Sequence, residues 1–310
     1  MIYTITLNPA LDRTITVKSL IEDETIRVIS ENRYAGGKGI DVSRVIKELG
    51  GKSIALGFVG GYDGSELEGR LLNDGVLTSF VHISGNTRTN VIIHEKDTTR
   101  KFLISAPGPM IQPHEIGQLY DQVRSLPEEG YVVISGSIPP GVRPTIYGQL
   151  VMAAKDLGAV VALDSDGEPM KEGVRLAPHI IKPNIHELGR LVGHTIKSEK
   201  EIVATSRKLC SKGIEIVIVS RGAKGLVVVT KKKTIKAVPP SIKVQSAVGA
   251  GDATLAGFVL AHSKKRPLEE CVRLACASGA ATAMTPGTEL CHREDVEKIL
   301  PQVQITSISY

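Results

Sequence analysis

The residues with the clearest potential for chemistry lie in one short segment, Val248-Gly249-Ala250-Gly251-Asp252, which an apolar run follows. Gly249 and Gly251 let the backbone turn sharply and approach a ligand closely. A helix that begins at Asp252 points its free N–H groups and the positive end of its dipole at whatever lies in front of it. That position suits a phosphoryl group in transfer, and the Asp252 carboxylate suits removal of a proton from an attacking hydroxyl. The alternative is that Asp252 is an ordinary N-cap.

A second set of polar residues follows two expected strands in the second half of the chain. Asn184 and Glu187 lie three positions apart at the start of a helix, so their side chains point the same way. They could organise a hydrated Mg²⁺ ion and phosphates, or they could form a capping box. Ser220 precedes a loop with Gly222 and Gly225, which suits passage beneath phosphates, although an ordinary β-turn has the same composition.

Charged residues in the first half are candidates for binding the acceptor of that phosphoryl group. Asp12 follows the first strand and could bind sugar hydroxyls. Gly37 and Lys38 belong to the run Ala-Gly-Gly-Lys-Gly, which brings backbone and an ammonium group close to a ligand. Lys38 and Arg88 could together hold a phosphate that the substrate already carries. Taken singly, these residues could also be a surface acid, a glycine-rich turn and an edge arginine.

Two familiar nucleotide-binding signatures do not fit. Gly51-Lys52-Ser53 ends like a phosphate-binding loop, but Ile46 occupies the position that such a loop reserves for its first glycine. The glycine run before Lys38 lacks dinucleotide spacing, and no acid ends a second strand about twenty residues later. The sequence therefore excludes a P-loop NTPase and a Rossmann dehydrogenase.

Composition excludes several other classes of protein. The 310 residues are 42% hydrophobic and 23% charged, as in a soluble globular protein. The net charge is +5, but the basic residues are interleaved with acids, and with 4% aromatic residues there is little to stack on bases, so nucleic-acid binding is not expected. The N-terminus does not read as a signal peptide, and no apolar run approaches the roughly 20 residues that span a bilayer. We expect a cytoplasmic protein with no membrane partner.

The elements that must position these residues read as one α/β body. From about residue 130, continuous apolar strands alternate with helices, which predicts a mostly parallel sheet buried on both faces. The expected strands are 131–135, 160–164, 179–182 and 214–220, with a hairpin at 225–238. The expected helices are 144–157, 185–192, 200–212, 252–262, 268–284 and 293–300.

The first hundred residues mix that pattern with a different one. An N-terminal strand over 1–7, helices over 41–49 and 65–73 and a strand over 53–59 belong to the body. Segments 14–17, 25–30, 90–95 and 101–105 alternate polar and apolar residues, which predicts half-exposed strands, with a turn at Asp97-Thr98-Thr99. We expect a small sheet, inserted at about 12–34 and 86–106, that acts as a lid on a single domain spanning 1–310 and excludes water from the site.

Together these motifs resemble the ribokinase-like carbohydrate kinases, and within them the sugar-phosphate branch of 1-phosphofructokinase, tagatose-6-phosphate kinase and the minor bacterial 6-phosphofructokinase. The resemblance runs nearly end to end. The matching segments are 6–12, 36–40, 87–88, 134–141, 182–184 with Glu187, 220–222, 248–252 and 287–288.

The resemblance implies a three-layer α/β/α fold with a small β lid that often forms a dimer interface. It implies that Asp252 is the catalytic base and that the N–H groups of Gly249, Ala250 and Gly251 form the anion hole. ATP and Mg²⁺ would bind near Lys182, Asn184, Glu187, Ser220, Gly222 and Gly225, with the adenine near Pro239 and Ser278 and with Glu187 reaching the metal through water. The sugar phosphate would bind near Asp12, Gly37, Lys38, Asp41, Arg88 and Ser137.

The chain departs from the branch at two places. Asp41 stands where the branch usually has Asn, which removes a hydrogen-bond donor and adds a charge close to an anionic substrate. That change could alter the preferred sugar, or Asp41 could be neutralised by pairing with Lys38. The lid segment usually reads Val-Asn-Arg-Val, whereas here it reads Thr25-Ile26-Arg27-Val28.

The expected function is ATP- and Mg²⁺-dependent phosphorylation of a ketohexose monophosphate to the bisphosphate. Tagatose 6-phosphate and fructose 1-phosphate are the leading substrates, and fructose 6-phosphate follows. Two alternatives stay open at this point. One is a kinase of a neutral sugar or nucleoside on the same fold, and the other is a sugar-phosphate sensor without catalysis.

Overall fold

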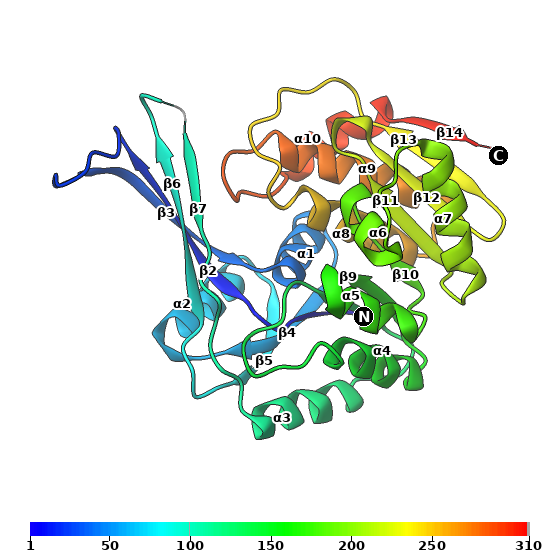
Figure 1. Ribbon diagram of the computed structural model, residues 1–310, viewed down its shortest axis with the longest axis horizontal. Helices are drawn as coiled ribbons and strands as arrows, with labels where there is room; N and C mark the ends of the chain where they lie inside the picture. The colour runs from blue at the N-terminus through cyan, green and yellow to red at the C-terminus, as the bar shows by residue number, and fades with distance from the viewer. Residues whose placement is uncertain (99, 309–310) are drawn as a thin grey trace.

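The computed structural model describes residues 1–98 and 100–308, and its body is built on a ten-stranded sheet with the order β14-β13-β12-β11-β10-β9-β8-β1-β4-β5 (Figure 1). These strands are β1 (Ile2–Thr6), β4 (Ser53–Val59), β5 (Leu77–His82), β8 (Tyr131–Ser135), β9 (Val160–Asp164), β10 (Ile180–Ile181), β11 (Ile216–Ser220), β12 (Leu226–Thr230), β13 (Thr234–Val238) and β14 (Gln304–Ser307). From β11 to β5 all pairs are parallel, and β12, β13 and β14 add antiparallel pairs at one edge.

Helices cover both faces of this sheet, which makes three layers. One face carries α3 (Pro113–Arg124), α4 (Ile146–Asp156), α5 (Gly167–Arg175), α6 (Ile185–Val192) and α7 (Glu199–Ser211). The other carries α1 (Lys38–Glu48), α2 (Gly61–Asn73), α8 (Ala250–Ser263), α9 (Leu268–Ala283) and α10 (Arg293–Ile299). Two short 3₁₀ turns are η1 (Gly222–Lys224) and η2 (Leu300–Gln302).

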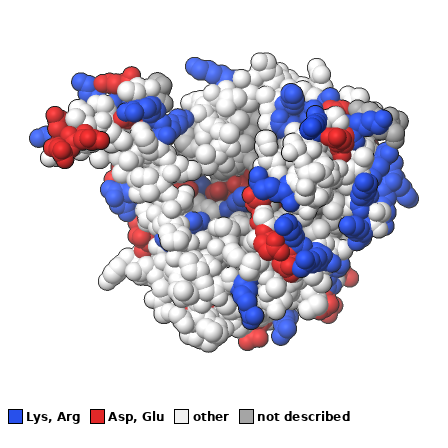
Figure 2. Space-filling view, in the orientation of Figure 1, with Lys and Arg blue, Asp and Glu red and all other residues white. Residues whose placement is uncertain are grey.

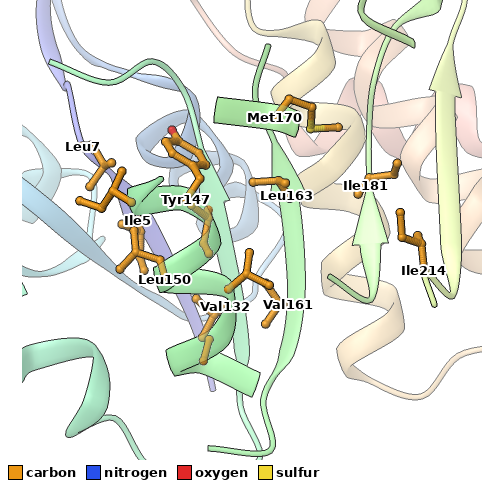
Figure 3. Packing of buried hydrophobic residues seen from close by; sticks show 14 of the residues in the cluster. Ile5, Leu7, Val132, Tyr147, Leu150, Val161, Leu163, Met170, Ile181 and Ile214 are labelled. Atoms are coloured by element: carbon orange, nitrogen blue, oxygen red, sulfur yellow. The ribbon is translucent and has the colours of Figure 1, made fainter. Parts of the chain in front are cut away.

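Three hydrophobic clusters of described residues hold these layers together, one on the face that carries α3 to α7 and two on the face that carries α1, α2 and α8 to α10. In the first, Tyr147 and Leu150 of α4 pack over Ile5 of β1 and Val132 of β8 (Figure 3). The second surrounds α8, whose residues from Asp252 to Ala261 are all buried because the helix packs against both α1 and α9. This burial on every side explains the uniformly apolar run that follows Asp252 in the sequence.

A small four-stranded sheet of order β3-β2-β6-β7 stands apart from the body (Figure 1). Its strands are β2 (Ala10–Val17), β3 (Val28–Gly36), β6 (Arg88–Glu95) and β7 (Lys101–Ile104). β2 pairs antiparallel with β3 and parallel with β6, so the two chain segments that the sequence predicted as insertions form one sheet. The predicted turn at 97–99 includes Thr99, which lies outside the described residues.

The body places the candidate functional residues at one end of its parallel strands, where their carboxyl ends lie. The strand order reverses around β1, which lies between β8 and β4 in the middle of the sheet. Ligands of open parallel sheets bind at the carboxyl ends of strands beside such a reversal. The segments that follow β8, β10 and β11 begin at this end of the sheet, and they carry Ser137, Lys182, Asn184, Gly222 and Gly225.

Most predicted elements are confirmed within a few residues, but four elements were missed. They are β5, α3, α5 and β14. β5 and β14 are edge strands with several exposed residues, so they lack the continuous apolar run of the central strands. The predicted strand 25–30 begins later than expected, at Val28, and extends to Gly36.

Candidate active site

The N-terminus of α8 has the glycine turn and the first-turn carboxylate that the sequence predicts. Gly249 is the N-cap of α8 with φ 76°, a left-handed conformation that glycine adopts without strain. Asp252 lies in the first turn and is 8% exposed. Burial raises the pKa of Asp252 to about 7, with the positive charge of Lys38 acting in the opposite direction. A carboxyl with this pKa can accept a proton near neutral pH.

A cavity of about 670 Å³ opens in front of the N-terminus of α8. This volume is typical of sites for small ligands. It is lined by the sequence-predicted residues Lys38, Lys182, Asn184, Glu187, Ser220, Gly222, Gly225, Pro239, Gly249, Ala250, Gly251 and Asp252. Apolar residues of the 239–247 segment and of α9, among them Ile242 and Ala280, complete the wall. The cavity thus has an apolar part that suits a flat base and a polar part that suits phosphates.

Asn184 and Glu187 form the capping box that the sequence allowed. The Asn184 side-chain oxygen accepts from the Glu187 N–H at 2.9 Å, and Glu187 Oε2 accepts from the Asn184 N–H at 2.7 Å. The second oxygen, Glu187 Oε1, lies 4.0 Å from Lys38 Nζ and faces the cavity. A single carboxylate oxygen fits a hydrated Mg²⁺ ion that is held mainly by water and by nucleotide phosphates.

The loop after β11 passes close to the neighbouring strands. Ser220 bridges to Asn184, and its N–H donates to the Pro183 carbonyl at 3.2 Å. Gly225 has φ 73°, and a Cβ at this position would lie 1.9 Å from the Ala237 carbonyl oxygen. The glycine is therefore required by the close approach of β13, which fixes the Ser220–Gly225 loop along the cavity wall.

Ser278 is a correction to the predicted site. Its side chain is fully buried, and its Oγ donates to the Leu274 carbonyl at 2.8 Å within α9. A Cβ at Gly257 of α8 would lie 2.7 Å from Ser278 Oγ, so Ser278 belongs to the contact between α8 and α9. Its neighbours Gly279 and Ala280 line the cavity instead.

Asp164, at the end of β9, is a site residue that sequence reasoning missed. It is fully buried, with Oδ1 3.3 Å from Lys38 Nζ and Oδ2 3.0 Å from Lys182 Nζ. Burial alone would raise the pKa of Asp164, but the two ammonium groups outweigh it and hold that pKa below its usual value. The available signal was the acid at the carboxyl end of a predicted apolar strand, close to the position that Lys182 occupies directly after β10.

The residues predicted to bind the sugar come from the small sheet and from the loops after β1 and β8. Asp12 of β2 lies opposite Asn90 of β6, whose side-chain amide donates to Asp12 Oδ1 at 2.8 Å. The two terminal nitrogens of Arg88 donate hydrogen bonds to the carbonyls of Asn8 and Ala106, at 2.9 and 2.8 Å. The Asn8 amide in turn reaches Ser137 Oγ at 3.5 Å, so these residues form one continuous wall.

The contacts of Lys38 and Asp41 bear on two predicted pairings. Lys38 faces Asp164 and Glu187 at the cavity in front of α8, whereas Arg88 contacts the carbonyls of Asn8 and Ala106, and a phosphate shared by Lys38 and Arg88 stays a prediction. Asp41 pairs with Arg44, at 3.6 Å, rather than with Lys38. Burial, together with the nearby charge of Asp252, raises the pKa of Asp41 well above its ordinary value, and Arg44 offsets this only in part.

Figure 2 shows the surface hollowed between the small sheet and the body, with acidic and basic side chains inside the hollow. The acids Asp12, Asp41 and Asp252 come from β2, α1 and α8. The predicted sugar wall of Asp12, Asn90 and Arg88 and the cavity lined by Asp252 are the two parts of the candidate site. Within the described residues, no helix is long and apolar enough to cross a membrane.

Comparison with known proteins identifies this arrangement. The family model described as pfkB family carbohydrate kinase matches residues 5–295. The 1-phosphofructokinase of Bacillus subtilis (strain 168) is 38% identical over 308 residues, covering 99% of this chain and 100% of the relative. The D-tagatose-1-phosphate kinase of Bacillus licheniformis is 34% identical over 309 residues, covering 99% and 100%.

A solved structure agrees with these relatives. The tetrameric inhibited form of phosphofructokinase-2 from Escherichia coli matches with a TM-score of 0.92 and 32% identity, covering 97% of this chain and 98% of that chain. The ribokinase-like three-layer fold that the sequence predicted is therefore confirmed. The chain belongs to the pfkB family of carbohydrate kinases, and it is a phosphotransferase that acts on a sugar hydroxyl.

Proposed function

We propose that this kinase transfers the γ-phosphoryl group of ATP to a hydroxyl of a ketohexose monophosphate and forms the bisphosphate. The observation that carries the proposal is the position of Asp252, a buried carboxyl between the nucleotide cavity and the wall of Asp12, Asn90 and Arg88. A kinase needs a base at that boundary to deprotonate the hydroxyl that attacks the γ-phosphoryl group of the nucleotide. A sensor that only binds a sugar phosphate does not need such a base.

In this mechanism Asp252 takes the proton of the attacking hydroxyl. The hydroxyl oxygen forms a bond to the γ-phosphorus while the bond to the bridging oxygen breaks, and ADP leaves with that electron pair. The N–H groups of Gly249, Ala250 and Gly251 lie at the N-terminus of α8, where Ala250 N–H makes only a long contact of 3.4 Å to the Ala247 carbonyl, so they can hold the charge that develops on the phosphoryl oxygens.

Mg²⁺, when bound with the nucleotide, would neutralise charge on the phosphates. Glu187 is the residue that would hold it through water, because Oε1 faces the cavity while Oε2 caps α6. Adenine would lie against Pro239 and the face of α9 at Ala280. Asp12, Asp41, Gly37 and Ser137 would contact the sugar.

Arg88 is the residue best suited to the phosphate that the substrate already carries. Its guanidinium is anchored by two backbone carbonyls next to Asp12, and its Nε is buried with no hydrogen-bond partner among the described residues. A buried donor of this kind calls for a partner, and an oxygen of a bound sugar phosphate would supply one.

The named relatives support a phosphorylated ketohexose as the acceptor. One relative is named for fructose 1-phosphate and another for tagatose 1-phosphate, a substrate that adds to the tagatose 6-phosphate and fructose 6-phosphate considered from the sequence. The test is ADP release with Mg-ATP and each of these four compounds, ranked by kcat/KM against free fructose and tagatose. Preference for one phosphorylated ketose supports the proposal, and equal turnover of the free sugars would overturn it.

We also propose that the chain works as one kinase unit in the cytoplasm, with the small sheet as its lid and as a homodimer interface. Val28, Ile29, Leu103 and Ile104 on β3 and β7 are each at least half exposed, which leaves apolar surface on that sheet uncovered. A second copy of the chain could cover it, as expected for an exposed apolar patch of a soluble kinase.

A further inference from the structure

Asn90 holds the carboxylate of Asp12 from the neighbouring strand. β2 and β6 run parallel, and their register sets Asp12 directly opposite Asn90. The Asn90 amide nitrogen donates to Asp12 Oδ1 at 2.8 Å, and Asn90 Oδ1 accepts from the Ala106 N–H at 3.2 Å. A backbone N–H can only donate and an ionised carboxylate can only accept, so these two partners together fix which way the Asn90 amide faces.

The second carboxylate oxygen of Asp12 is left for a ligand. A Cβ at Gly36 would lie 2.4 Å from Asp12 Oδ2, so the missing side chain of Gly36 gives this oxygen its room. Among the described residues, the Asn90 amide is the only group that donates a hydrogen bond to the Asp12 carboxylate, and it donates to Oδ1. Oδ2 can therefore accept a hydrogen bond from a hydroxyl that enters the cleft.

The charge on Asp12 depends on Asn90. Burial raises the pKa of Asp12, and the hydrogen bond from Asn90 is the largest of the effects that oppose this rise. An ionised carboxylate accepts a stronger hydrogen bond than a neutral one, so a donor that keeps Asp12 ionised strengthens its hold on a hydroxyl. The charged and titratable side chains around Asp12 come from β3, β6 and α1, and they are Tyr34, Arg88, Arg44 and Asp41.

The backbone of Ala106 keeps Asn90 in place. Its N–H donates to Asn90 Oδ1, and its carbonyl accepts from Arg88 at 2.8 Å. Arg88 and Asn90 lie two positions apart on β6, so their side chains leave the strand on the same side. One residue after β7 thus fixes both side chains, and the oxygen of the Asn90 amide is already occupied when a ligand arrives.

We infer that Asn90 is a positioning residue for the sugar, because it keeps the Asp12 carboxylate charged and turned so that Oδ2 accepts from a hydroxyl of the acceptor. This inference rests on the proposed function, in which Asp12 contacts the sugar, and deepens it. Asn90 acts through Asp12 and takes no part in the transfer of the proton or of the phosphoryl group.

The first test compares KM for the two substrates. Asn90→Ala should raise KM for the preferred ketohexose phosphate about tenfold or more, the usual cost of losing a hydrogen bond to a charged group, while KM for ATP changes less than about twofold. Thr89→Val is the matched control, because Thr89 faces the other side of β6 and donates to Asp63 at 2.8 Å. It should leave both KM values within about twofold. Equal effects of the two variants would overturn the inference.

A double variant tests whether Asn90 acts through Asp12. In an Asp12→Ala background, Asn90→Ala should change KM for the sugar phosphate by less than about twofold, because residues that act as a unit are not additive. A full additional loss in the double variant would mean that Asn90 contacts the sugar itself, and this would overturn the inference.

The third test needs no substrate. The Asp12 carboxyl carbon can be followed by ¹³C NMR in protein labelled at aspartate, with its signal assigned by its loss in Asp12→Asn. The pKa of Asp12 should be higher in Asn90→Ala than in wild type, because the donor that favours the charged form is gone. If Asn90→Ala does not fold, Asn90→Asp replaces the donor but keeps an acceptor for the Ala106 N–H, and it should shift the pKa in the same direction.

The outcomes of this test separate the inference from the proposed function. An unchanged pKa of Asp12 in the Asn90 variants would overturn the inference, whichever sugar the enzyme accepts. A raised pKa of Asp12, found in an enzyme that phosphorylates none of the ketohexose phosphates, would count against the proposed function and would support the positioning of Asp12 by Asn90.

Discussion

The guanidinium of Arg44 lies 3.6 Å from the carboxylate of Asp41, one turn along α1. Arg44 divides its charge, because its Nε also lies 3.4 Å from Asp74 and a terminal nitrogen donates to the Ala35 carbonyl. Asp41 is therefore only partly compensated within a cleft that also contains Asp12 and Asp252. An anionic sugar phosphate entering this cleft meets less repulsion when Asp41 is protonated.

Replacement of Asp41 by Asn should make sugar-phosphate binding less sensitive to pH. The pKa of Asp41 is raised well above its ordinary value, first by burial and then by Asp252, so Asp41 ionises only as the pH rises. The wild-type KM for the sugar phosphate should therefore increase with pH relative to that of Asp41→Asn.

The check on Asp41 is KM for sugar phosphate and for ATP from pH 6 to 9 in both proteins. Asp74→Asn is the matched control, because Asp74 shares Arg44 but its side chain is 50% exposed. Identical pH profiles for wild type and Asp41→Asn would contradict the expected repulsion.

The pKa of Asp252 predicts an acid limb in the rate. Burial raises this pKa to about 7, so below that pH the carboxyl is protonated and cannot act as a base. We expect kcat/KM to rise with pH through about 7 and then level off. A limb near pH 4, the region of an ordinary Asp, would contradict the assigned environment.

Asp252 should also make stability depend on pH. Because its folded pKa lies above its unfolded value, the group favours the unfolded state increasingly as the pH rises from about 4 to about 7. Asp252→Asn should therefore melt at a higher temperature than wild type at pH 8 and differ less at pH 5. The reverse order would mean that the carboxylate is stabilised in the fold.

Gly249 should not tolerate alanine. Its φ of 76° is costly for any residue with a Cβ, by about 1–2 kcal/mol, and the new Cβ would lie 2.6 Å from Leu290 Cδ2. Gly249→Ala should lower both the melting temperature and kcat because it displaces the start of α8. Gly69→Ala on α2 is the control, since a Cβ there meets nothing within 4 Å. Comparable effects of the two substitutions would contradict this account.

A charge in place of an exposed apolar residue on an edge strand of the small sheet should disrupt self-association. Ile29 of β3 is 55% exposed, and Ile29→Glu should convert a dimer to a monomer in sedimentation experiments. Tyr62→Glu on α2, where the side chain is 95% exposed, is the control and should leave the assembly unchanged. Wild-type protein that sediments as a monomer would refute the proposed interface.

Many of the site residues could be predicted from the sequence because they lie beside strong local signals. Gly249 to Asp252 precede an apolar helix, and Asn184 and Glu187 form a capping motif, so each could be recognised within its own segment. Asp164 has only the weaker signal of an acid at the end of an apolar strand, and its contact with Lys38, 126 positions away, has no local mark in the sequence.

The remaining misses also have physical causes. Ser278 lies one position from the cavity-lining Gly279, and on a helix one position is a rotation of about 100°, enough to turn a side chain into the core. α5 begins at Gly167 directly after Asp166, a pair whose composition resembles a turn, although Asp166 in fact caps the helix by accepting from the Gly167 N–H at 2.7 Å.

The most direct test of the central claim is ³¹P NMR of purified protein mixed with Mg-ATP and fructose 1-phosphate, and in parallel with tagatose 6-phosphate, fructose 6-phosphate and tagatose 1-phosphate. The account predicts ADP and a second phosphomonoester signal on the sugar in at least one mixture, with neither formed by Asp252→Asn at the same protein concentration. ADP accompanied only by inorganic phosphate, or equal product from Asp252→Asn, would contradict it.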